Sequence, residues 1–291
     1  MSSRAAGGAR RRFWFPGPTG NPGRINISKT TPSPDERTMT RNYRKIFSAI
    51  MLLAALCVAA APAAGQDQAK ALFKQGVALL QEGKFKEAAE RFTKALEADP
   101  ELVEAYINRG IAYLKMGQVE EAVADFTEAL DLAPEAAEAY YNRALALSRL
   151  GKLHQALADY TKALEFHPKD WQIFYNRGNL YLDLDKPAEA VKDFDRALEL
   201  KTDVPEVVHN RGLAYLLLGD LDKALKDFER VLAAQPQFAR AYYNKAQALE
   251  RLGRTQEAAA AYRHFLKVGH PTTDKALLEK ALTNLQALEG K

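Results

Sequence analysis

An Arg followed by a small residue recurs along this 291-residue chain at intervals of 34 residues. The occurrences are Arg109-Gly110, Arg143-Ala144, Arg177-Gly178 and Arg211-Gly212, and Lys245-Ala246 follows at the same interval. A fixed interval of this size is typical of repeat proteins, in which each unit buries its apolar face only by stacking on its neighbours. Such a chain presents long surfaces instead of one closed pocket, which favours binding over catalysis.

Small and large side chains occupy fixed places in units of 34 residues counted from Ala69. Place eight holds Gly or Ala in every unit and place twenty holds Ala, while places four and twenty-four hold mostly aromatic or large aliphatic residues. The small residues allow two helices to approach closely, and the large side chains fill the space around them. Place twenty-four consists of Phe92, Phe126, Tyr160, Phe194, Phe228 and Tyr262.

Each unit is predicted to form a helix, a turn and a second helix. Places four, eight and eleven share one face of a first helix, and places twenty, twenty-four, twenty-seven and twenty-eight share one face of a second. Gly at place fifteen suits the left-handed residue that ends a helix, and Pro at place thirty-two ends the second helix. The fourth unit departs twice, with Asp185-Lys186-Pro187 at the turn and Thr202 in place of the terminal Pro.

These places resemble the tetratricopeptide repeat (TPR), whose signature has a small residue at place eight, Ala followed by an aromatic four residues later, and a terminal Pro. The resemblance implies an all-α fold, a right-handed superhelical solenoid whose first helices line a concave groove. The resemblance covers six repeats within residues 66–272. Residues 273–291 lack the motif, and their Leu278, Leu282 and Leu285 predict a C-terminal capping helix with these leucines on its apolar side. The repeats are 69–102, 103–136, 137–170, 171–204, 205–238 and 239–272.

Residues 39–65 have the pattern of a secretory signal peptide. Basic residues precede an apolar run at residues 46–61, and Ala61-Pro62-Ala63 offers a small-x-small cleavage site. The run is shorter than the roughly 20 apolar residues of a membrane-spanning helix. We therefore expect export to the periplasm without stable membrane insertion, with an anchor through residues 46–61 as the alternative. Residues 1–38, rich in Arg, Gly and Pro, are predicted to be disordered or to precede the genuine translation start.

Charge and residue types argue against several kinds of chemistry. Residues 66–291 hold 31 Lys or Arg and 35 Asp or Glu, so the basic stripe that nucleic-acid binding needs is not expected. The only cysteine, Cys57, lies in the apolar run, and the five histidines follow no metal-ligand spacing. We therefore expect a non-enzymatic chain with no catalytic residues, no metal and no cofactor.

Amide side chains recur at place six of repeats two to six. An amide both donates and accepts hydrogen bonds, so a row of them along a groove suits the backbone of an extended peptide. The alternative is that these amides bond to the neighbouring helix. The row consists of Asn108, Asn142, Asn176, Asn210 and Asn244.

Apolar residues at places five, nine and twelve form a second stripe on the first helices. Part of this stripe is expected to pack between adjacent first helices, and the rest is predicted to contact a ligand in the groove. The predicted contacts are Tyr141, Tyr175, His209, Leu213, Leu216 and Tyr243.

Together these features predict a protein-interaction adaptor of the cell envelope that binds a peptide or partner protein in its concave groove. The alternative is a structural subunit of an envelope or secretion assembly that associates through its convex or terminal surfaces. The sequence names no partner.

Overall fold

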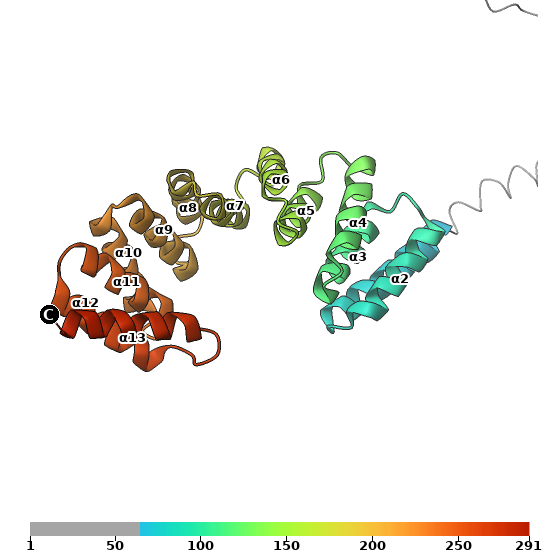
Figure 1. The fold of residues 1–291 in the computed structure, drawn as a ribbon. Coiled ribbons are helices and arrows are strands. Elements are labelled where there is room, and N and C mark those ends of the chain that lie inside the picture. The colour runs from blue at the N-terminus through green and yellow to red at the C-terminus, as the bar shows by residue number, and fades with distance from the viewer. Residues whose placement is uncertain (1–64, 291) are drawn as a thin grey trace, which may run out of the picture. The chain divides into compact units, whose positions relative to one another are not determined.

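The computed structural model describes residues 65–290, and every regular element in that range is a helix. The predicted extension and the cleavage site of the signal lie outside the described residues. Consecutive helices pack against one another, and the helix pairs follow one another along an arc in Figure 1. The prediction of an all-α solenoid of helix-turn-helix units is confirmed.

The helix pairs correspond to the 34-residue units. The first pair consists of the helix at residues 65–81 and α2 (Phe85–Ala98). The remaining pairs are α3 (Val103–Met116) and α4 (Val119–Leu132), α5 (Ala137–Arg149) and α6 (Leu153–Phe166), α7 (Trp171–Asp183) and α8 (Pro187–Leu200), α9 (Pro205–Leu218) and α10 (Leu221–Ala234), and α11 (Ala239–Arg251) and α12 (Thr255–Val268). The last helix is α13 (Lys275–Glu289).

The turn within each repeat keeps its geometry even in the irregular fourth unit. Gly117 ends α3 in the left-handed conformation with φ 79°, and Asp185 reaches the same region with φ 55°. Asp is one of the few residues with a side chain that tolerate this conformation. Pro187 then begins α8, where its missing N–H and fixed φ fit the first helical turn.

The core consists of the places that the repeat pattern predicts. The alanines at place twenty are 0% exposed in all six repeats, and the rings at place twenty-four are at most 2% exposed. In the four repeats with Gly at place eight, the ring of the second helix packs directly against that Gly of the first. The sequence prediction of interlocking small and large residues is confirmed.

α13 packs against α12 and covers the end of the array, as expected for a capping helix. Its buried residues are Ala281 and Leu285, with Leu278 partly buried beside them. Leu282 is 48% exposed, so its predicted place on the apolar side was wrong. The reason is that Ala281 and Leu285 lie one turn apart on the packed face, and Leu282 is rotated about 100° from Ala281.

None of the helices in residues 65–290 combines the length and the apolar character that a membrane span needs.

Candidate peptide-binding surface

The row of place-six amides lies on successive first helices. Asn108, Asn142 and Asn176 each donate from Nδ2 to the backbone carbonyl of the residue four positions earlier, at 2.8, 3.0 and 2.9 Å. These bonds hold each amide against its own helix and use one of its donor hydrogens. Asn142 is buried, and the other four are partly exposed.

Three of the amides also bond to the place-five side chain of the preceding repeat. The pairs are Asn176 with Tyr141 Oη at 3.0 Å, Asn210 with Tyr175 Oη at 3.4 Å, and Asn244 with His209 Nε2 at 3.0 Å. These bonds join residues that are 35 positions apart, so they link adjacent first helices. The structure therefore contains the alternative predicted from the sequence, in which the amides bond to the neighbouring helix. Peptide binding by these amides stays a prediction.

His209 replaces the Tyr found at place five of neighbouring repeats. Its Nδ1 lies 2.9 Å from Asn210 Oδ1, and its Nε2 lies 3.0 Å from Asn244 Nδ2. Because Asn244 donates to Nε2, this arrangement assigns the proton of a neutral ring to Nδ1. The ring is 6% exposed and packs against Phe228 and Phe238, and this burial lowers the pKa of His209.

Three of the predicted ligand contacts are buried, namely His209 and two side chains of the core. Leu216 is 5% exposed, and Tyr243 is 6% exposed with its ring against Tyr262 and Phe265. Their burial assigns these two side chains a packing role between helices in this structure. Tyr141, Tyr175 and Leu213 are partly exposed, and ligand contact by them stays a prediction.

An apolar patch on α9 consists of Leu213 and Leu217, and the sequence interpretation missed Leu217. Leu213 is partly exposed at place nine, and Leu217, one turn further at place thirteen, is 53% exposed. The sequence signal for Leu217 is its contrast with place thirteen of the other repeats, because all of them have a polar or charged residue there. Those residues are Gln81, Lys115, Arg149, Asp183 and Arg251.

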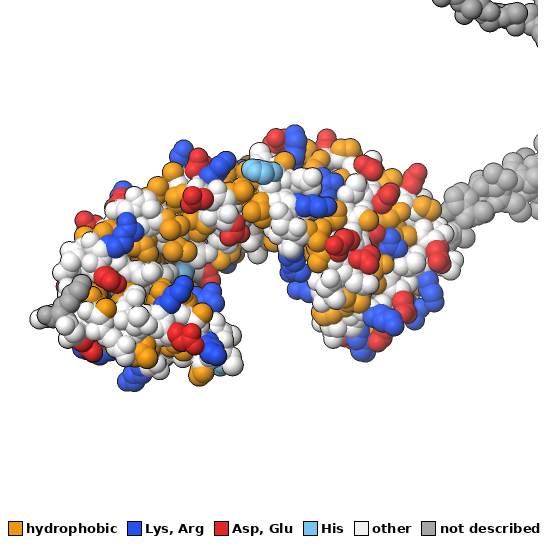
Figure 2. Space-filling view, viewed as in Figure 1, with side chains coloured by type: hydrophobic (Ala, Val, Ile, Leu, Met, Phe, Trp, Pro, Cys, Tyr) orange, Lys and Arg blue, Asp and Glu red, His pale blue; other side chains and the backbone are white. Residues whose placement is uncertain are grey.

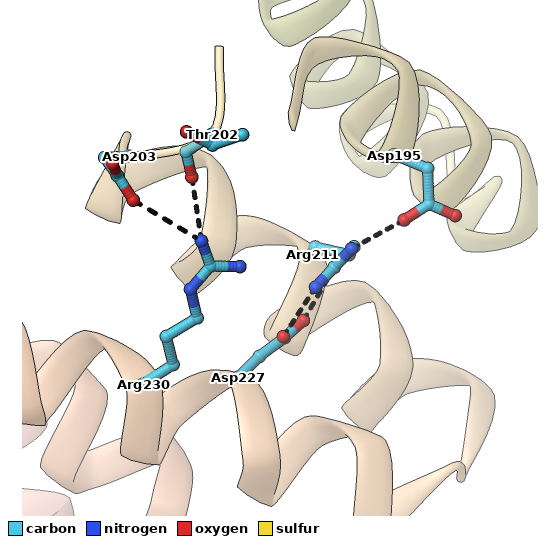
Figure 3. Close-up of polar contacts among 6 residues, drawn as sticks. All are labelled: Asp195, Thr202, Asp203, Arg211, Asp227 and Arg230. Atoms are coloured by element: carbon cyan, nitrogen blue, oxygen red, sulfur yellow. Dashed lines mark hydrogen bonds and ion pairs between the residues drawn. The ribbon is translucent and has the colours of Figure 1, made fainter. Parts of the chain in front are cut away.

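The Arg of the recurring dipeptide is a structural residue. In repeats two to five it forms two hydrogen bonds of 2.7 to 2.9 Å to an Asp at place twenty-three of the same repeat. It also reaches the second helix of the preceding repeat, and Arg211 makes this third contact with Asp195 at 2.7 Å (Figure 3). The hydrogen bond to Asp227 raises the pKa of Arg211. The pairs are Arg109–Asp125, Arg143–Asp159, Arg177–Asp193 and Arg211–Asp227.

Sequence reasoning used this Arg only as a marker of the period and found no partner for it. The signal was the Asp that recurs at place twenty-three in the same four repeats. Each Arg contacts both helices of its own repeat and the helix before it. Its charge is therefore used in contacts within the solenoid.

The outer surface carries charges of both signs. Figure 2 shows Lys and Arg side chains interspersed with Asp and Glu over the visible face, with apolar side chains between them. A hollow of about 540 Å³ is lined by residues that include Thr93 of α2 and Tyr113 of α3, and one of about 720 Å³ is lined by residues that include Arg211 and Lys223. These hollows follow the second helices and are not lined by the place-six amides.

Known family models match the repeats of this chain. Tetratricopeptide repeat models match residues 103–135, 137–170 and 171–202, and residues 209–268. A TPR repeat model matches residues 76–117. No curated protein matches the chain.

Several solved structures share the fold. YrrB, described as a TPR protein with an unusual peptide-binding site, is 29% identical, covers 66% of this chain and 98% of its own, and has a TM-score of 0.58. A tetratricopeptide repeat protein from Parabacteroides merdae is 21% identical, with 77% and 93% coverage and a TM-score of 0.61. Pseudomonas aeruginosa pilF is 19% identical, with 78% and 99% coverage and a TM-score of 0.63. The repeat places, the stacked helix pairs and these matches show that the chain belongs to the tetratricopeptide repeat family.

Proposed function

We propose that this protein is a non-enzymatic adaptor whose first helices bind an extended segment of a partner protein. TPR repeats are protein-interaction modules, and the description of YrrB as carrying a peptide-binding site supports the narrower choice of a peptide. The observation that carries the proposal is the α9 patch, where the exposed Leu217 extends the apolar surface of Leu213 at a place that is polar or charged in the other repeats.

The surroundings of the α9 patch suit a peptide backbone. Asn210 of α9 donates from Nδ2 to Asn179 Oδ1 of α7 at 2.7 Å, so two amides from adjacent repeats lie together, one of them three residues from Leu213 along α9. An apolar side chain of the partner would bury its surface on the patch, at about 25 cal/mol per Å² of apolar area removed from water. The amides would bond to the backbone on either side of that side chain.

The α9 patch is tested by introducing a charge into its apolar surface with the fold preserved. The purified protein is screened on an immobilised peptide array, and the peptides that bind are measured again with Leu213→Asp and Leu217→Asp. Both variants should lose binding while their circular dichroism stays helical. Leu252→Asp is the control, because Leu252 is an exposed leucine in the turn after α11, outside the patch. Equal binding by the patch variants and the control would move the site away from α9.

We also propose that the protein is exported and that its mature chain begins near Ala64 or Gln66. The basic residues, the apolar run at residues 46–61 and the Ala61-Pro62-Ala63 site support this proposal. Amino-terminal sequencing of protein recovered from the cell envelope tests it. A chain that retains residues 46–61 would support the membrane-anchored alternative.

A further inference from the structure

The turn between α8 and α9 differs from the other turns between repeats. Thr202 stands at the place where four repeats have Pro, and Pro205 begins α9 instead. Arg230 of α10 reaches across to this turn. Its Nη2 donates to the carbonyl oxygen of Thr202 at 2.8 Å and lies 3.7 Å from Asp203 Oδ1 (Figure 3).

A pocket of about 310 Å³ opens beside this turn, and we call it the α9–α10 pocket. Val208 of α9 and Val231 of α10 line it while only 2% and 1% exposed, so they form its floor. Ala234 and Arg230 are exposed and form its rim on α10. The volume lies within the range of about 300–1,000 Å³ that is typical of ligand pockets.

Repeats two, three, four and six have an aromatic ring at the place that Val208 occupies in repeat five. Val208 and Ala234 occupy places four and thirty of repeat five. In repeat three these places hold Tyr140 and Phe166, whose rings stack with their centroids 6.2 Å apart. In repeat five the two small side chains leave that volume open.

Repeat six shows which side chain lies beside an aromatic ring at place four. Tyr242 at place four stacks on His264, with ring centroids 5.2 Å apart. His264 occupies place twenty-six, which in repeat five is Arg230.

Repeat five also has the smallest combination of residues at places four and thirty. The pairs in the other repeats are Leu72 with Ala98, Tyr106 with Leu132, Tyr140 with Phe166, Phe174 with Leu200, and Tyr242 with Val268.

We propose that the α9–α10 pocket binds an aromatic side chain, Tyr or Phe, presented by a partner protein. The ring takes the volume that Tyr140 and Tyr242 fill in their own repeats, with its apolar surface on Val208 and Val231. The Arg230 guanidinium lies beside the ring, where a cation attracts the face of an aromatic side chain. Aromatic side chains in closed apolar pockets are the usual anchors of protein interfaces.

This site is separate from the α9 patch. Val208 and Leu213 are five residues apart on one helix, which places them about 140° apart around its axis. The pocket opens at the turn before α9, whereas Leu217 lies in the last turn of that helix. Loss of peptide binding in the α9 patch variants would therefore leave this proposal standing.

The pocket is tested with p-cresol, the side chain of tyrosine as a free molecule. NMR titration of the full chain with labelled valine methyl groups should show saturable shifts for Val208 and Val231. Val208→Tyr fills the pocket from within and should weaken p-cresol binding about tenfold or more. Leu72→Tyr makes the matched change at place four of repeat one and should leave the affinity unchanged. Absence of saturable shifts, or equal affinity of Val208→Tyr and the unsubstituted chain, would overturn the proposal.

A second variant controls for a disturbance of the fold by Val208→Tyr. Ala234→Leu narrows the same pocket from α10, with the residue that repeat two carries at this place. It should also weaken p-cresol binding while circular dichroism stays helical. Binding that survives in this helical variant would contradict the assigned pocket.

The preference for an aromatic ring is tested with 4-methylcyclohexanol, which has a similar shape but no π system. It should bind several-fold more weakly than p-cresol, and Arg230→Gln should reduce that difference. Equal affinity for the two probes would refute an aromatic site.

The source of the side chain is tested in two further arms. The capped tripeptide acetyl-Gly-Tyr-Gly-amide should bind as tightly as p-cresol, and a pocket that admits p-cresol but excludes the tripeptide is a site for a small molecule. Residues 13–15 of this chain, Phe-Trp-Phe, are also aromatic. If their replacement by Ala shifts the Val208 and Val231 resonances and raises p-cresol affinity, the occupant is this chain itself, and the partner assignment is wrong.

Discussion

A Cβ atom on Gly110 would lie 2.6 Å from Cε1 of Phe126, a distance that no unstrained contact allows. The same relation holds for Gly76 with Phe92, Gly178 with Phe194 and Gly212 with Phe228, at 2.5 to 2.8 Å. The two repeats that have Ala at place eight have Tyr, not Phe, at place twenty-four. The chain thus pairs Gly with Phe and Ala with Tyr.

A third place changes together with this pair. Place twelve is Leu in the four repeats with Gly and Phe, but it is Ser148 or Glu250 in the repeats with Ala and Tyr. Tyr262 donates from Oη to Glu250 Oε2 at 3.0 Å, so its ring is held toward place twelve. In repeat six, a polar partner for the ring hydroxyl therefore accompanies the Ala at place eight.

Gly178→Ala should destabilise the protein by about 1 to 3 kcal/mol, because the added methyl group would overlap the ring of Phe194. The gain in helix propensity, about 1 kcal/mol, offsets only part of this. Adding Phe194→Tyr and Leu182→Ser, which reproduces the residues of repeat three, should restore part of the stability. Urea unfolding measures both effects, and an unchanged midpoint for Gly178→Ala would show that the contact is loose.

Enlarging the alanines at place twenty should overpack the helix pair. Ala156 and Ala190 are 0% exposed, so substitution by Leu should cost about 1 to 3 kcal/mol and spread to adjacent repeats. Ala158, exposed on the same helix as Ala156, is the matched control, and Ala158→Leu should melt like the unsubstituted chain. Thermal melts that do not distinguish Ala156→Leu from Ala158→Leu would contradict the tight interface.

Removing one member of the Arg–Asp pair should be among the most damaging single changes. Arg177 and Asp193 have side chains 16% and 7% exposed, so Arg177→Ala would strand a carboxylate in the interior, at a cost of about 3 kcal/mol. Arg196 forms an exposed pair with Glu199, so Arg196→Ala should cost at most about 0.5 kcal/mol. Chemical unfolding compares the two, and similar losses would mean that the Arg177 pair is effectively solvated.

His209 should make stability depend on pH. Burial lowers its pKa in the folded chain, so below the ordinary histidine value of about 6.5 the unfolded state binds more protons than the folded state. Its polar neighbours are Asn210 and Asn244, and the nearby charge of Arg240 also lowers the pKa. Its contribution to stability is therefore present at neutral pH and is lost as the pH falls below that value.

The control for this effect comes from the repeats themselves. His209→Tyr introduces the residue found at place five of repeats three, four and six and should flatten the fall in melting temperature between about pH 7.5 and about pH 5.5. His154→Tyr changes an exposed histidine and should keep the original pH dependence. If His209→Tyr shows the same fall in melting temperature, this histidine is not the source.

The place-six amides should differ in their contribution to stability. Asn176 bonds to its own helix and to Tyr141, whereas the bond of Asn108 is to its own helix. Asn176→Ala should therefore cost about 0.5 to 1.5 kcal/mol more than Asn108→Ala, the value of one hydrogen bond. Thermal unfolding measures the difference. Equal losses would indicate that the bond to Tyr141 contributes nothing to the stacking of the repeats.

The sequence alone determined the period, the helix pairs, the turns and the interlocking core places. These features depend on residues within one repeat, because the spacing along a helix decides which side chains share its face. The wrong prediction for Leu282 fits this account, because α13 follows the last repeat and no repeat pattern defines which of its faces is packed.

The tertiary structure decided the contacts that join one repeat to the next. The bonds of Asn244 to His209 and of Arg211 to Asp195 cross between repeats, and the α9–α10 pocket exists because Val208 and Ala234 face the same space from two helices. Such contacts depend on how closely and at what angle whole helices stack. That geometry arises from the summed packing of many side chains, and no pattern within a single repeat specifies it.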